Sequence, residues 1–131
     1  FLTILGQMDA YPGVIDAENS RYLPFLLSTT ILMAAVKSGV GRETAHEAIK
    51  EHAVATVHDL RAGTINSNNL LDRLAADERI PLTREDLEAL LVAGRANVGS
   101  ALRQVQSFND TVGEFVAKYP DDASYTPGSI L

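Results

Sequence analysis

The fold is decided by the stretch from residue 42 to residue 62, which reads RETAHEAIKEHAVATVHDLRA. Apolar and small side chains recur in it at three- and four-residue steps, the spacing of one face of an α-helix. That face carries Ala45, Ala48, Ile49, His52, Ala53, Thr56, Val57 and Leu60. Charged side chains fall elsewhere on the helix, at Glu43, Glu47, Lys50, Glu51 and Arg61. The pattern therefore predicts an amphipathic helix that packs one face into a core.

The same spacing recurs through most of the chain, and no run of alternating β-branched residues competes with it. We therefore expect an all-α fold, a helical bundle. Five further helices are predicted. An opening helix ends by Tyr11-Pro12-Gly13, and the next runs from a possible N-cap at Asp16 to Lys37-Ser38. A short helix through Leu70, Leu71 and Leu74 is capped by Ser67 or Asn68, another begins with a capping box at Thr83–Asp86 and buries Leu87, Leu90 and Leu91, and the last covers residues 96–118.

Proline and glycine mark the expected irregularities. An interior proline removes one backbone hydrogen bond and clashes with the preceding turn, so Pro24 predicts a kink or break between residues 22 and 25. Gly39 can take the left-handed position that ends a helix. Gly99 and Gly113 each cost about 1 kcal/mol relative to Ala inside a helix, so we expect both to permit a close backbone approach.

Composition excludes several classes of function. The 131 residues carry 11 Lys and Arg against 17 Asp and Glu, a net charge of −6, so the chain lacks the positive field that binding to nucleic acid requires. With no Cys, thiolate zinc sites, iron–sulfur clusters and a cysteine nucleophile are excluded. The absence of Cys is compatible with the cytoplasm.

Neither a membrane span nor a signal peptide is expected. The longest mainly apolar run, residues 23–36, is interrupted by polar residues and is shorter than the roughly 20 residues that cross a bilayer. The chain opens at Phe1 without an initiator Met or a basic segment, so we interpret it as a piece of a longer polypeptide.

No self-contained active site is evident. His46, His52 and His58 are six residues apart, so no two share a helix face, whereas metal-binding pairs need a spacing of three or four. We expect two surface histidines and one packed histidine, His52. The carboxylates of Asp9, Asp16, Glu18, Asp121 and Asp122 are interpreted as solvated or capping groups, and Ser20 and Ser28 lack the context of a nucleophile. We assign no catalytic, cofactor-binding or metal residue and expect no cofactor.

The C-terminal segment 125–131 reads YTPGSIL and leaves two interpretations open. Termini are commonly frayed. Alternatively, Tyr125, Ile130 and Leu131 could anchor an arm on this domain or on a neighbouring subunit.

Several segments taken together resemble the C-terminal part of bacterial adenylosuccinate lyase. They are DAENSRYL at 16–23, the apolar helix at 25–36, KSGV at 37–40, GRETAHE at 41–47 and the ending YTPGSIL. In that family, an Asn-containing helix start leads into a long helix of the central bundle, followed by a short glycine break and the start of the final domain.

The resemblance implies a division of the chain and an activity for its parent. Residues 1–39 correspond to the end of the central helical domain, and residues 40–131 correspond to the C-terminal helical domain, with an extended tail from about residue 120. The family consists of C–N lyases of purine biosynthesis that eliminate fumarate from adenylosuccinate and from a related succinylated ribotide (SAICAR) by general acid/base chemistry. The parent is expected to be a cytoplasmic homotetramer.

The family's catalytic serine loop does not occur in this sequence, and its catalytic histidines and phosphate-binding residues lie upstream of Phe1. The resemblance therefore implies that this segment is inactive alone and supplies scaffold and subunit contacts, while the small-molecule substrate is bound mainly elsewhere. Two alternatives stay open at this point: a free-standing helical interaction module, and another fumarate-releasing enzyme such as argininosuccinate lyase.

Overall fold

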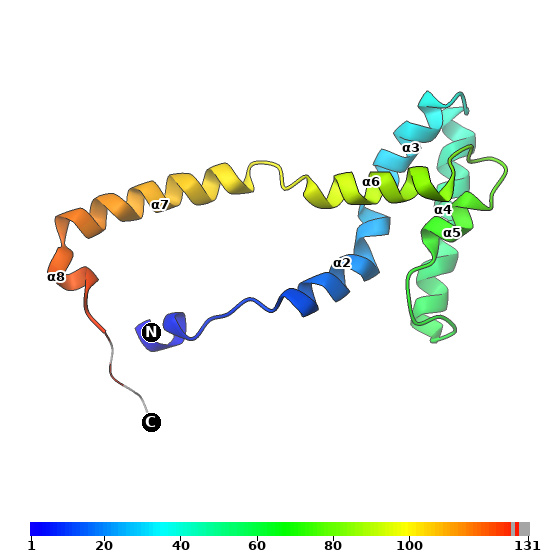
Figure 1. Cartoon of the computed structure of the whole chain (residues 1–131). Coiled ribbons are helices and arrows are strands. Elements are labelled where there is room, and N and C mark those ends of the chain that lie inside the picture. The colour runs from blue at the N-terminus through cyan, green and yellow to red at the C-terminus, as the bar shows by residue number, and fades with distance from the viewer. Residues whose placement is uncertain (127, 129–131) are drawn as a thin grey trace. The chain divides into compact units, whose positions relative to one another are not determined.

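A computed structural model of the chain describes residues 1–126 and residue 128. Helices are its only regular elements within those residues, so the predicted all-α fold is confirmed (Figure 1). In order they are α1 (Leu2–Gly6), α2 (Pro12–Leu26), α3 (Ser28–Lys37), α4 (Arg42–Ala62), α5 (Leu70–Ala75), α6 (Arg84–Ala96), α7 (Ala101–Lys118) and α8 (Pro120–Ala123).

The chain divides into two units. One is residues 12–97, which hold α2 to α6, and the other combines residues 1–11 with those from 98 onward. The hydrophobic core belongs to the first unit.

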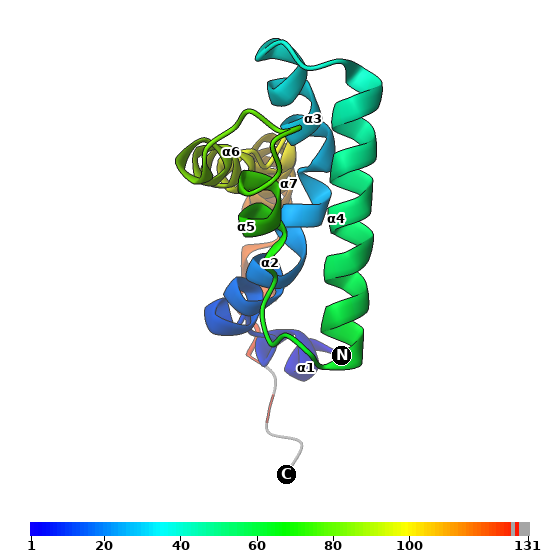
Figure 2. The same ribbon diagram turned by 90° about the vertical axis from the view of Figure 1, so that its right-hand side faces the viewer.

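Helix α4 organises that core. Helices α3 and α5 both pack against it, and α6 packs against α3 and α5; Figure 2 shows α3 running beside α4. The observed bounds of α4 are those predicted, and its predicted apolar face is the buried one. The buried core residues are Ile31, Leu32, Ala35, Ala45, Ala48, Ile49, Leu70, Leu71, Leu74, Ile80, Leu82 and Leu87.

The break between α2 and α3 lies later than predicted. Pro24 is buried inside α2, and the helix is interrupted at Leu27 rather than between residues 22 and 25. The backbone N–H of Leu27 donates to the carbonyl of Leu23 at 3.0 Å, so the helical hydrogen bonding continues past Pro24 before the interruption. The side chain of Leu27 packs against α6 at Gly94, where an added Cβ would lie 2.5 Å from Leu27 Cδ2. The absence of a side chain at residue 94 therefore makes room for the Leu27 side chain.

The opening helix α1 ends at Gly6, which confirms that it stops before Tyr11-Pro12-Gly13. The start of α2 corrects another expectation. Pro12 is the first residue of α2, because proline has no N–H to lose and its fixed φ suits a first helical turn. Asp16 is therefore inside α2 and does not cap it.

A second break divides the expected helix over 96–118. Helix α6 ends at Ala96 and α7 begins at Ala101, and Gly99 between them has a φ of +59°. Gly99 thus serves a left-handed turn and not the close helix contact that we expected. Gly113 is inside α7, and apart from its chain neighbours and the nearby backbone of its own helix, no described atom lies within 4 Å of the position its Cβ would take. The expected close approach at Gly113 is therefore not observed.

The other helix ends agree with the predictions from the sequence. Gly39 has a φ of +100° after α3, as predicted. At the start of α6, Asp86 N–H donates to Thr83 Oγ1 and Thr83 N–H donates to Asp86 Oδ2, which confirms the capping box. Asn68 Oδ1 accepts from Leu70 N–H at the start of α5. Leu87 is fully buried and Leu90 and Leu91 are partly buried.

In the second unit, neither α7 nor α8 buries a residue. Residues 120–123, which we expected to be extended, form the short helix α8. The open question about the C-terminal segment concerns mainly residues 127 and 129–131, which lie outside the described residues. Across the described chain, no helix combines the length and hydropathy needed to cross a membrane.

The contact between Gly94 and Leu27 generates a prediction. Gly94→Ala gains about 1 kcal/mol of helix propensity but forces Leu27 out of its position, which costs about 1–3 kcal/mol. We expect a net loss of stability in thermal unfolding followed by circular dichroism. In a Leu27→Ala background the same substitution should instead be stabilising, since the crowding atoms are gone. Gly113→Ala is the control, because open space surrounds it, and it should raise helix stability. Equal effects of Gly94→Ala in both backgrounds would contradict this packing.

Candidate functional site

The three histidines do not converge. His46 and His58 are exposed on α4, whereas His52 is partly buried and its Nε2 lies 2.7 Å from Asp77 Oδ2. The interpretation of two surface histidines and one packed, hydrogen-bonded histidine is confirmed.

Asp77 is the centre of the most connected polar cluster. Arg79 donates to it from the backbone N–H at 2.9 Å, from Nε at 3.0 Å and from Nη2 at 2.7 Å. The same Nη2 also donates to Glu51 at 2.6 Å. These hydrogen bonds, chiefly those of the Arg79 side chain, hold the pKa of Asp77 well below its usual value although burial opposes the shift. Asp77 and then Glu51 raise the pKa of Arg79.

The Asp77 cluster joins α4 to the connection between α5 and α6. His52 and Glu51 belong to α4, while Asp77 and Arg79 belong to the connection. Neither Asp77 nor Arg79 could be singled out from the sequence, because loop residues have no periodicity and His52 is 25 residues from Asp77. An Asp–His pair also occurs in catalytic sites, but here Arg79 binds the same carboxylate, and among the described residues the imidazole of His52 hydrogen-bonds to Asp77 alone. These contacts link two parts of the core.

A second polar cluster connects α4 to the first turn of α5 and to Asn69, which precedes it. Arg73 Nη2 lies 2.5 Å from Asp59 Oδ2, and its Nε donates to Asn69 Oδ1 at 3.0 Å. The hydrogen bond from Arg73 lowers the pKa of Asp59. Thr56, the buried polar residue of α4, donates to the same Asn69 oxygen at 3.3 Å. This second cluster satisfies polar groups at the edge of the core.

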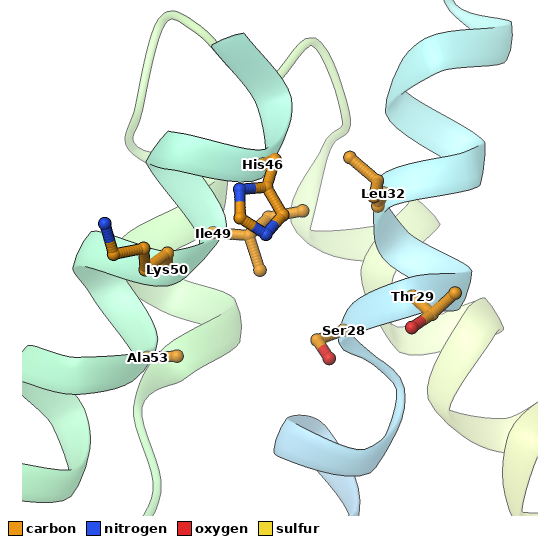
Figure 3. A pocket seen from close by; sticks show the side chains of 7 residues that line it. All are labelled: Ser28, Thr29, Leu32, His46, Ile49, Lys50 and Ala53. Carbon is orange, nitrogen blue, oxygen red and sulfur yellow. The ribbon is translucent and has the colours of Figure 1, made fainter. Parts of the chain in front are cut away.

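A cavity of about 210 Å³ lies between α3 and α4 (Figure 3). It is lined by Ser28, Thr29, Leu32, His46, Ile49, Lys50 and Ala53. The hydroxyl groups come from the first turn of α3, and the imidazole of His46 extends from α4 into the gap between the helices. The side chains of Leu32 and Ile49 provide an apolar floor. The sequence placed His46 on the surface and Ser28 outside any site, and it did not bring the two together.

The remaining candidate groups form no catalytic pair. Asp9, Asp16, Asp121 and Asp122 are exposed. Asp16 pairs with Arg95 of α6, and Ser20 donates its hydroxyl proton to the backbone carbonyl of Asp16 at 2.8 Å. Within residues 1–126 and 128, no three His, Asp or Glu side chains are grouped as metal ligands.

The Asp77 cluster predicts a response to acid. Because its pKa is lowered in the folded state, Asp77 contributes fully to stability above its ordinary pKa of 3.8, and the contribution is lost as the pH falls through the folded-state value. Asp77→Asn should cost about 1–3 kcal/mol near neutral pH and weaken the dependence of stability on pH below about 4. Urea unfolding at several pH values measures both effects. Glu47→Gln, in the exposed pair with Lys50, is the control and should change stability by less than about 1 kcal/mol. A loss no larger for Asp77→Asn than for Glu47→Gln would show that the Asp77 cluster is not stabilising.

Comparisons with known proteins cover most of the chain. The model of the adenylosuccinate lyase C-terminus matches residues 24–108. An adenylosuccinate lyase of Saccharomyces cerevisiae is 33% identical over 109 residues, which cover 82% of this chain and 22% of that protein. An adenylosuccinate lyase of Schizosaccharomyces pombe is 31% identical over 121 residues, which cover 90% of this chain and 24% of that protein. An adenylosuccinate lyase of Schistosoma mansoni is 28% identical over 113 residues, which cover 85% of this chain and 23% of that protein.

The chain thus spans less than a quarter of the length of these relatives. They are eukaryotic proteins, so a bacterial branch stays a prediction. The family match includes all of α3 to α6, the helices that contribute the buried core. Since it extends over well more than half of the sequence, the chain belongs to the adenylosuccinate lyase family, in whose C-terminal region it lies.

Proposed function

We propose that this chain is the C-terminal helical part of a C–N lyase that eliminates fumarate from adenylosuccinate and SAICAR in purine biosynthesis. Its role there is to supply scaffold and subunit contacts. The names of the relatives and the description of the matching family model support this assignment over argininosuccinate lyase. No residue of the chain receives a catalytic role.

The observation that carries the scaffold role is the exposed apolar face of α7. This helix buries no residue, yet its apolar side chains gather at three- and four-residue spacing. Exposed fractions reach 75% for Leu102, 68% for Phe108 and 60% for Phe115. Apolar faces of this kind mark surfaces that another polypeptide segment covers. We assign this covering to the rest of the parent enzyme, because the relatives are more than four times as long as the segment they share with this chain.

The proposed parent is a cytoplasmic homotetramer that needs no cofactor. Residues 1–39 form the end of its central helical domain, and residues 40–131 form its C-terminal helical domain. The substrate is held mainly by parts of the enzyme outside this chain. In support, α3 is apolar on most sides, as a helix inside a bundle must be, and Met33 on it is still 45% exposed here.

The assignment predicts that the 131-residue chain alone releases no fumarate from adenylosuccinate, since the proposal places the reacting groups in parts of the parent enzyme outside this chain. Activity should appear when residues 1–131 replace the matching C-terminal segment of the Saccharomyces cerevisiae relative. Fumarate release, followed by ultraviolet absorbance, measures both proteins.

The same chimera tests the face of α7. Phe108→Asp should abolish assembly and activity, because burying an unpaired carboxylate is costly. Arg103→Asp, on the opposite face of α7, is the control and should leave activity close to that of the unmodified chimera. Turnover by the lone chain, or full activity of the Phe108→Asp chimera, would falsify the scaffold role. A monodisperse, inactive lone chain together with an inactive chimera would favour a free-standing interaction module.

A further inference from the structure

The cavity between α3 and α4 has a lining whose charge contrasts with that of the whole chain. The protein has a net charge of −6, yet no carboxylate lines this cavity, and two of its seven lining residues are basic types, His46 and Lys50. Lys50 lies at the rim, where its Nζ is 3.3 Å from Glu47 Oε1 on the same helix. Ser28, Thr29 and His46 are the other polar residues of the lining, and Figure 3 shows the imidazole of His46 directed toward α3.

These polar groups are available to a ligand. Within the described part of the chain, the side chains of Ser28, Thr29 and His46 form no hydrogen bond with another protein group. Helical serines and threonines commonly donate to the carbonyl four residues earlier, as Ser20 does here. Ser28 and Thr29 do not, so each hydroxyl can donate to a ligand oxygen. The imidazole of His46 carries an N–H donor in either protonation state.

The rest of the cavity lining is apolar. Leu32 and Ile49 are buried members of the core, and Ala53 continues this surface along α4. A volume of about 210 Å³ lies below the usual range for drug-sized ligands. The occupant must therefore be small, with an oxygen-rich head and a short hydrocarbon body.

We propose that the cavity between α3 and α4 binds a small carboxylate with a short hydrocarbon body. The carboxylate oxygens accept hydrogen bonds from Ser28, Thr29 and His46, and the hydrocarbon part lies on Leu32 and Ile49. Hydrogen bonds to a charged acceptor are stronger than those between neutral groups, so the carboxylate is preferred over a neutral amide of the same shape.

Butyrate is a suitable probe, added to the full 131-residue chain at millimolar concentration and followed by ¹H–¹⁵N NMR. We expect saturable shifts of the backbone amides of Ser28, Thr29, His46 and Ile49. Butyramide tests the requirement for charge, and inorganic phosphate tests the requirement for a hydrocarbon body; both should bind at least about tenfold more weakly. Absence of saturable shifts with butyrate, or equal binding of either comparison compound, overturns the proposal.

Substitutions locate the site. His46→Ala should weaken butyrate binding by about tenfold or more. His58→Ala is the matched control, because His58 is on the same helix with its side chain 81% exposed and is outside this cavity, so binding should be unchanged. Ser28→Ala provides a second variant that removes only one hydroxyl, and circular dichroism verifies that each variant is folded. Equal butyrate affinity in folded His46→Ala, Ser28→Ala and the unmodified chain places the ligand elsewhere. The assay measures binding to the chain itself, so its outcome does not depend on lyase activity.

Discussion

Burial of one face of α4 is the constraint on which the rest of the core depends. Ala45 and Ala48 are completely buried on it, and the completely buried Ala35 belongs to α3. Side chains this small allow the backbones of neighbouring helices to approach, so that Ile31 and Ile49 fill the remaining space. Larger side chains at these alanines would separate the helices and open the positions that Leu70 and Leu74 fill from α5.

Local signals made α4 and the start of α6 predictable. A 21-residue amphipathic pattern fixes the helix and its buried face, and the Thr83–Asp86 capping box acts within a single turn. The breaks at Leu27 and Gly99 were harder to place, because an interior proline or glycine signals that a helix is weakened without specifying where tertiary packing bends it. At Leu27 that packing comes from Gly94, which is 67 residues away in sequence.

Long-range polar contacts escaped sequence analysis for the same reason. Periodicity placed His52 on the inner face of α4 but could not identify its partner, since Asp77 is in a connection whose path depends on the packing of α5. The cavity is a similar case, because Ser28 and His46 belong to separate helices and neither has an unusual local context. Family resemblance was informative about the parent enzyme, and it could not supply these contacts either.

The two kinds of helix in this protein differ in what keeps them folded. Helices α3 to α6 bury apolar residues against one another, whereas α7 is an 18-residue helix that buries none. In proteins most of the stability of a helix comes from packing of its amphipathic face, and many residues of α7, Thr111 and Gly113 among them, have low helix propensity. In the proposed scaffold role, contact with the rest of the parent supplies the stability that burial does not give α7. The core around α4 is held by burial within residues 12–97, so loss of that contact is expected to affect α7 before it affects the core.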